Sequence, residues 1–137
     1  MGFTKSGTRD VNSVFDTNIL IYHLNDALPK KAFEKIQQLM ANNATISVIT
    51  RMEILGAPKA LNQLDQAQKL MSAFTEQGLT EAIVDRVINL RQQQRIKLPD
   101  AIIAATALQL EKPLVTRNTN DFKSVIDLQL INPFLES

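Results

Sequence analysis

Apolar residues recur along much of this chain at the three- and four-residue spacing of an amphipathic helix. One such stretch, residues 99–110, is apolar on nearly every side, which is typical of a helix buried in a domain core. Thr80 precedes another stretch and is a suitable N-cap, because its hydroxyl can accept a backbone N–H. We therefore expect helices over residues 30–40, 61–74, 80–90 and 99–110.

Short apolar and β-branched runs separate these helices and predict strands. Strands that alternate with helices favour βαβ units, in which a parallel sheet is covered by helices on both faces. The sequence therefore predicts an α/β fold, namely a single three-layer α/β/α domain with a mainly parallel central sheet. The predicted strands are residues 13–15, 45–48, 114–116 and 128–131.

The length of 137 residues, with 45% hydrophobic and 21% charged residues, suits one globular domain with its own core. We interpret residues 1–12 as a flexible polar tail and residues 13–137 as the domain. Gly56-Ala57-Pro58 is interpreted as a turn between two helices. No apolar run approaches the ~18 residues of a membrane span, and the first residues lack a signal-peptide core. We expect a cytoplasmic protein without a membrane partner.

Composition removes several kinds of chemistry. The chain has no cysteine, which excludes disulfides, zinc–thiolate sites and thiol nucleophiles, and its single histidine, His23, excludes mechanisms that need two. Fifteen basic and fourteen acidic side chains give a formal net charge of +1. This is not the bulk basicity of a protein that coats nucleic acid, so a polyanion must be held by a local patch or through metal ions.

Acidic and polar side chains follow the predicted strands. Because ligands bind parallel sheets at the carboxyl ends of their strands, these side chains can meet at one rim. Carboxylates that converge there would repel one another, and a hard divalent cation such as Mg²⁺ or Mn²⁺ would remove that repulsion. One such ion can promote phosphodiester hydrolysis, and where two are bound, one activates water and the other stabilises the leaving oxygen. The residues in question are Asp16, Glu53, Asp100, Asn118 and Asp121.

Each of these residues also has an ordinary structural interpretation. Asp16 can cap the helix that starts at Thr17, Asp100 can stabilise a helix N-terminus, and Asp121 can form a turn. Glu53 can lie on a solvated helix face. The residue types alone leave both interpretations open.

Four segments in this order resemble the PIN domain family, in particular the VapC-type toxin ribonucleases of toxin–antitoxin systems. The resemblance covers nearly the whole chain and implies a parallel sheet with an acidic pocket for one or two Mg²⁺ or Mn²⁺ ions. The segments are VFDTNIL (14–20), SVITRMEI (47–54), LPDAIIAATA (98–107) and PLVTRNTNDF (113–122), followed by LINP (130–133).

The resemblance implies catalytic and metal-binding roles for Asp16, Glu53, Asp100 and Asp121. Asp16 and Asp100 would hold the principal ion, Glu53 would bind it directly or through water, and Asp121 would complete the pocket. Many members of the family have their last acid where this chain has Asn118, so Asn118 and Asp121 are alternatives for the fourth position. The supporting polar positions are Asn18, Thr116 and Asn118.

The implied substrate is RNA, hydrolysed at its phosphodiester bonds. Arg51, Lys97 and Arg117 lie beside the acids in the sequence and are candidate phosphate contacts, with Arg91 and Arg95 just upstream of Lys97. His23 has no assigned role.

The resemblance also implies a cognate antitoxin protein and a homodimer. The apolar stripes of residues 30–40 and 61–74 are either surfaces for these partners or internal core. Two alternatives keep the fold: a PIN nuclease for RNA maturation or decay that is not a toxin, and a catalytically idle domain that binds RNA or a partner.

Overall fold

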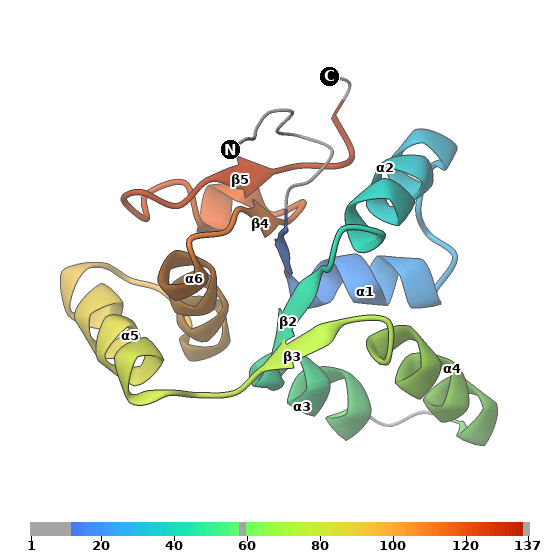
Figure 1. Cartoon of the computed structure of the whole chain (residues 1–137), viewed down its shortest axis with the longest axis horizontal. Coiled ribbons are helices and arrows are strands. Elements are labelled where there is room, and N and C mark those ends of the chain that lie inside the picture. The colour runs from blue at the N-terminus through green and yellow to red at the C-terminus, as the bar shows by residue number, and fades with distance from the viewer. Residues whose placement is uncertain (1–11, 58–59, 136–137) are drawn as a thin grey trace.

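The computed structural model describes residues 12–57 and 60–135, and its five strands form one parallel sheet. The strands lie in the order β3-β2-β1-β4-β5 (Figure 1). This arrangement confirms the predicted α/β class and parallel sheet. The strands are β1 (Val14–Phe15), β2 (Thr45–Ser47), β3 (Thr75–Gln77), β4 (Leu114–Val115) and β5 (Leu130–Ile131).

Helices cover both faces of the sheet and give the three layers that the sequence predicts. α5 and α6 pack on one face, whereas α1 to α4 lie on the other side (Figure 1). None of the helices in the described ranges is long and apolar enough to cross a membrane. The helices are α1 (Thr17–Leu24), α2 (Lys30–Met40), α3 (Val48–Gly56), α4 (Leu61–Met71), α5 (Glu81–Gln93) and α6 (Leu98–Leu110), with a short 3₁₀ helix, η2 (Thr119–Asp121).

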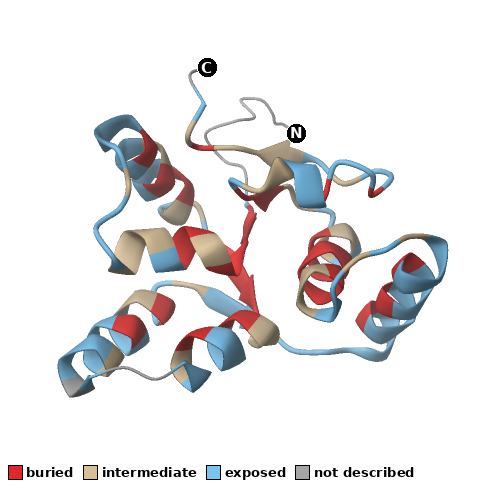
Figure 2. Ribbon diagram, turned by 180° about the vertical axis from the view of Figure 1, so that it is seen from behind, coloured by how far each residue is buried: buried red, intermediate tan, exposed pale blue. Residues whose placement is uncertain are grey.

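Alternation along the central strands divides the apolar core into two parts. Val14 belongs to the core under α5 and α6, whereas Phe15 belongs to the core under α1, α2 and α4. Leu114 and Val115 of the neighbouring strand repeat this division. Because consecutive strand residues point to opposite faces, two residues in each strand serve both cores. Figure 2 shows the central strands and the inner faces of the helices as buried.

Two helices have the features that their sequences predict. The Thr80 side chain accepts a hydrogen bond from the backbone N–H of Ile83 at 3.2 Å and caps α5. Residues 101–107 of α6 are buried without interruption, because this helix packs against both the sheet and α5. The N-terminal tail and Pro58 of the predicted turn lie largely outside the described residues.

The apolar stripes of α2 and α4 prove to be mainly internal core, which decides between the two interpretations of these stripes. Phe33 is the exception on α2, with 42% of its surface exposed. The predicted helix over residues 61–74 ends three residues early, because the chain turns there and enters β3. The stripe residues buried in the core are Ala32, Ile36, Leu39, Ala67 and Met71.

β3 is a strand that the sequence pattern does not predict. Its residues Thr75, Glu76 and Gln77 are all polar, and it lies at the edge of the sheet, paired with β2 alone. An edge strand that is largely exposed needs no apolar residues, so it gives no hydrophobic signal.

The strand order reverses beside β1. The chain runs outward from β1 through β2 to β3, then returns to place β4 on the other side of β1 and β5 beyond it. In open α/β sheets, a crevice forms at the carboxyl ends of the strands where the order reverses in this way. The residues that follow β1 and β4 therefore face each other across this crevice.

Candidate active site

Asp16 follows β1 and Thr116 follows β4, and their side chains meet at the reversal point. The Thr116 hydroxyl Oγ1 donates a hydrogen bond to Asp16 Oδ2 at 2.8 Å. The backbone N–H of Asn118 donates to the same Thr116 oxygen at 3.0 Å, which leaves the hydroxyl proton for Asp16. Asp16 is 3% exposed and Thr116 is fully buried. A buried carboxylate is thus held in one orientation.

The side chain of Asp16 does not serve as a helix cap. Asp16 occupies the N-cap position of α1, but its side chain makes no capping hydrogen bond. The carboxylate is turned toward β4 instead. Thr116 therefore orients the carboxylate, and a further hydrogen bond comes to it from the backbone N–H of Thr17 at the start of α1.

The pKa of Asp16 is raised from 3.8 to about 6, and burial is the largest cause. The Thr116 hydroxyl opposes this rise, because its hydrogen bond stabilises the charged carboxylate. The negative charges of Asp100 and Glu53 contribute to the rise. The ionised form of Asp16 is therefore disfavoured both by burial and by the nearby negative charges.

Glu53 lies on α3, and a pair of threonine hydroxyls orients its carboxylate. Thr17 Oγ1 donates to Glu53 Oε1 at 2.7 Å and lies 2.8 Å from Thr50 Oγ1. Because the single hydroxyl proton of Thr17 points to Glu53, the proton of Thr50 must point to Thr17. Glu53 is on the surface, whereas both threonines are buried. A short relay of hydroxyls therefore links α1 and α3 to this carboxylate.

Asp100 lies in the first turn of α6 and is half-buried, and Asp121 ends η2 and is exposed. Burial raises the pKa of Asp100, and the negative charges of Asp121 and Glu53 raise it further. Lys97 acts in the opposite direction, because its positive charge favours the carboxylate. Asp100 thus interacts electrostatically with four residues of the proposed site, because it also acts on Asp16.

The four acids form an electrostatic group around one rim of the sheet. Asp16 is perturbed by Asp100 and Glu53, and Asp100 by Glu53 and Asp121. Among residues 12–57 and 60–135, however, no three acidic or histidine side chains are close enough to hold one ion directly. The acids are therefore near enough to act on one another electrostatically, without forming a cluster of three ligands.

The remaining predicted polar positions lie around the same rim. Asn18 is half-buried in the first turn of α1. Asn118 is also half-buried and acts through its backbone N–H, which fixes the hydroxyl of Thr116. The structure thus links Asn118 to Asp16 through Thr116.

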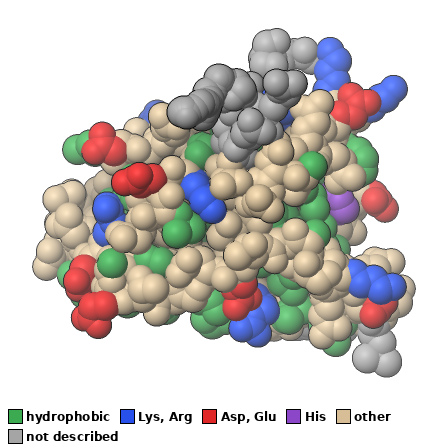
Figure 3. All heavy atoms as spheres, viewed as in Figure 1, with side chains coloured by type: hydrophobic (Ala, Val, Ile, Leu, Met, Phe, Trp, Pro, Cys, Tyr) green, Lys and Arg blue, Asp and Glu red, His purple; other side chains and the backbone are tan. Residues whose placement is uncertain are grey.

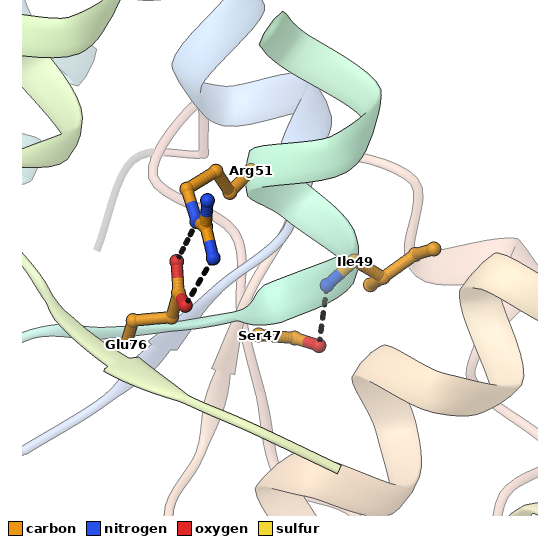
Figure 4. A network of polar contacts seen from close by, with 4 residues as sticks. All are labelled: Ser47, Ile49, Arg51 and Glu76. Carbon is orange, nitrogen blue, oxygen red and sulfur yellow. Dashed lines mark hydrogen bonds and ion pairs between the residues drawn. The ribbon is translucent and has the colours of Figure 1, made fainter. Parts of the chain in front are cut away.

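Two of the three predicted phosphate contacts are engaged within the protein. Arg51 binds Glu76 of β3 through two hydrogen bonds, at 2.5 and 3.1 Å (Figure 4). Arg117 donates to the Tyr22 hydroxyl at 3.2 Å, and its guanidinium lies over the ring of Phe134, 4.4 Å from the ring centre.

Lys97, the third predicted phosphate contact, faces a cavity. It lines a cavity of about 640 Å³ that also reaches Asp100 and Asp121. The same cavity is lined by Arg91 and Arg95. Asp16 and Glu53 do not line it, so the cavity adjoins only the part of the rim that belongs to α6 and η2.

Sequence reasoning did not identify Thr17 and Thr50 as site residues. Thr17 directly follows Asp16, and Thr50 lies one helical turn before Glu53. Their spacing from the acids was the available signal, but only the structure shows that the two hydroxyls contact each other across 33 residues.

Comparison with known proteins agrees with this fold. Residues 13–128 match the family model described as PIN domain. The chain is similar to Ribonuclease VapC1 of Haemophilus influenzae strain R2866, with 29% identity over 126 residues, covering 85% of this chain and 93% of the relative. It is also similar to Ribonuclease VapC of Rickettsia bellii, with 27% identity over 129 residues, covering 86% of this chain and 93% of the relative.

Solved structures give the same result. A toxin–antitoxin complex from Klebsiella pneumoniae contains a chain that is 33% identical, with a TM-score of 0.75 and coverage of 89% of this chain and 98% of that one. In VapBC-1 from nontypeable Haemophilus influenzae the identity is 26% and the TM-score 0.74, with coverage of 90% and 98%. The family match spans β1, the helices that carry all four acids and the crevice between β1 and β4. From its sequence, its fold and this match, the chain belongs to the PIN domain family.

Proposed function

We propose that this protein is an endoribonuclease that hydrolyses RNA phosphodiester bonds with Mg²⁺ or Mn²⁺, and that it is the toxin of a VapBC-type pair. The observation that carries the proposal is the hydrogen bond from Thr116 to Asp16, which holds a carboxylate in the crevice between β1 and β4. The pKa values of Asp16 and Asp100 are both raised by burial and by other acids of the group. Relatives named Ribonuclease VapC support the choice of RNA.

The donor set fits a hard divalent cation. All the candidate ligands are oxygens, and they repel one another, so a cation among them is favourable. Mg²⁺ usually keeps several waters and binds through one or two carboxylates, so a rim without a three-acid cluster is compatible with it. Asp16 and Asp100 would hold the ion. When bound, it would polarise the phosphate and lower the pKa of water.

The protein's own residues position the reacting groups. Thr116 keeps the Asp16 carboxylate oriented, and Thr17 does the same for Glu53. For the fourth position we favour Asp121, because its charge acts on Asp100, whereas the backbone of Asn118 acts on Thr116. Water would add to phosphorus, the bond to the 3′ oxygen would break, and that oxygen would take a proton. The products would carry 5′-phosphate and 3′-hydroxyl ends.

The test is cleavage of a labelled single-stranded RNA by the purified protein with Mg²⁺ or Mn²⁺, and with EDTA. Asp16→Asn and Asp100→Asn should each abolish cleavage. Asp65→Asn is the matched control, because Asp65 is exposed and pairs with Lys69 on its own helix. Sequencing the cut ends checks the product chemistry. Equal cleavage by Asp16→Asn and the parent protein would refute the assignment.

We also propose a cognate antitoxin and a homodimer. The Klebsiella pneumoniae neighbour is described as a toxin–antitoxin complex, which supports the first partner. An apolar hollow of about 230 Å³ lies next to Glu53, lined in part by Ile21, Leu24 and Ile54, and an inhibitor seated there would reach the rim. Growth arrest on expression, relieved by co-expression of an adjacent gene, separates a toxin from an RNA-maturation nuclease. Light scattering gives the oligomeric state.

A further inference from the structure

A cavity of about 640 Å³ lies beside the acidic rim and is mainly cationic on one wall. Its walls come from the end of α5, the turn between α5 and α6, the first turn of α6, and the η2 region. Arg91, Arg95 and Lys97 bring three positive charges to it, all from the α5–α6 region, and Asp100 and Asp121 bring two negative charges. The acidic wall belongs to the proposed catalytic group, so the cavity continues that site toward the cations.

The cations of this cavity are available to a ligand. Within residues 12–57 and 60–135, none of Arg91, Arg95 and Lys97 forms an ion pair. Arg91 donates from Nε to the backbone carbonyl of Ile96 at 3.2 Å, which fixes its position without neutralising its charge. A side-chain hydrogen bond of 2.7 Å from Ser124 to Gln94 joins the segment after η2 to the end of α5, and both residues line the cavity.

The other two predicted phosphate contacts, Arg51 and Arg117, do not line this cavity. Arg51 is neutralised by Glu76, and Arg117 is packed over Phe134 and bonded to Tyr22. The net charge of the chain is only +1, and Figure 3 shows basic and acidic side chains interspersed over one face. Affinity for a polyanion must therefore come from a local group of cations, and such a group adjoins the rim in this cavity.

We propose that Arg91, Arg95 and Lys97 form a phosphate subsite, which binds the RNA backbone next to the bond that is cut. This inference rests on the proposed nuclease function. An RNA strand whose scissile phosphate lies among the acids would place a neighbouring phosphate in the cavity. Guanidinium groups bind phosphate oxygens through paired N–H donors, and the flanking lysine adds a point charge. The subsite contacts the backbone and sets affinity without reading sequence.

The test compares two triple variants for RNA binding, both in the Asp16→Asn background so that the RNA stays intact. One carries Arg91→Gln, Arg95→Gln and Lys97→Gln. The control carries Lys30→Gln, Lys35→Gln and Lys69→Gln, which remove the same charge from α2 and α4. Fluorescence anisotropy with a labelled single-stranded RNA gives Kd over a series of salt concentrations, and thermal unfolding checks that each variant is folded.

The subsite variant should bind the RNA about tenfold more weakly at physiological salt, and its log–log salt slope should fall by roughly 2, since each phosphate contact contributes about 0.7 on a single strand. The control should keep the slope of the parent. Arg91→Lys with Arg95→Lys should keep most of the slope, because the charge remains. With Asp16 restored, the subsite variant should cleave with a raised KM and little change in kcat.

The outcomes distinguish the two proposals. If the parent cleaves RNA and the subsite variant keeps its Kd and salt slope, the subsite is refuted and the nuclease stands. An equal loss of slope in the control variant also refutes the subsite, because bulk charge would then explain the binding. If the parent does not cleave RNA but the slope falls only in the subsite variant, the cavity binds RNA and the proposed activity is refuted.

Discussion

The Thr116 hydroxyl lies 2.8 Å from the Asp16 carboxylate, although 100 residues separate them in the sequence. The contact crosses from β4 to β1, the pair of strands between which the sheet order reverses. Thr116 lowers the pKa of Asp16 while burial raises it. This one hydrogen bond thus partly offsets the electrostatic cost of the site and also orients the carboxylate.

Replacing Thr116 by Val should raise the pKa of Asp16 above about 6, because the hydrogen bond to the charged form is lost. A hydrogen bond to a charged group contributes about 1.5–3 kcal/mol, so cleavage near neutral pH should fall roughly ten- to hundredfold. The acid limb of the pH–rate profile should move to higher pH. Thr116→Ser keeps the hydroxyl and should keep the limb in place. An unchanged limb in Thr116→Val would show that the bond does not tune Asp16.

Asp16→Asn should stabilise the protein at neutral pH in the presence of EDTA while it abolishes cleavage. The pKa of Asp16 is about 6 in the folded protein and 3.8 as the ordinary value, so the folded state binds more protons between these pH values. The free energy of unfolding of the parent should therefore fall as pH rises from about 4 through 6, by up to ~3 kcal/mol.

Urea unfolding at several pH values measures this effect. The difference between Asp16→Asn and the parent should be largest above pH 7 and should vanish below about pH 3, where the carboxyl is protonated in both states. A difference that does not change with pH would mean that packing, and not the buried charge, sets the stability. The parent protein is thus expected to be less stable than Asp16→Asn, as is common where a residue serves activity and not stability.

Mg²⁺ or Mn²⁺ should raise the unfolding temperature of the parent protein, and EDTA should reverse the shift. At a cation concentration 100 times Kd the stabilisation is about 2.7 kcal/mol for one site. Asp16→Asn and Asp100→Asn should lose most of the shift. Asp65→Asn should show the full shift, since Asp65 is exposed on α4 and pairs there with Lys69. A shift of the same size in all four proteins would place the cation elsewhere.

Thr17→Val should lower both stability and activity. It leaves the buried hydroxyl of Thr50 without its partner, which costs about 1–3 kcal/mol, and it releases the carboxylate of Glu53. Adding Thr50→Val should restore much of the stability, because both hydroxyls are then removed. Cleavage should stay low in this double variant. Recovery of cleavage together with stability would show that Thr17 acts only on folding.

Much of the fold is predictable from local patterns. The strands β1, β2 and β4, which are buried, the half-buried β5 and the buried helix α6 all follow from apolar runs in the sequence, and Thr80 caps α5 as predicted. β3 was missed because Thr75, Glu76 and Gln77 gain their strand conformation from pairing with β2, which the local sequence does not show. Parallel pairing depends on a partner that is distant in the sequence.

The site was predictable as a set of acids and not as a set of contacts. The carboxyl ends of parallel strands meet by topology, so Asp16 could be expected near the residues after β4. The partners of Arg51 and Arg117 could not be expected, because Glu76 and Phe134 lie on other elements and reach them only in the folded chain. Nearness in sequence to an acid therefore did not identify which cations remain available to RNA.

The central position of β1 delays assembly of the crevice while the chain is being synthesised. β1 leaves the ribosome well before β4, one of its two neighbours, because β4 begins only at Leu114. Until that segment emerges, the edge of β1 is open and Asp16 lacks the hydroxyl that orients it. A nascent chain with this topology cannot assemble the crevice, so an enzyme that cuts RNA would stay harmless to its own message and ribosome until the segment that carries β4 has emerged.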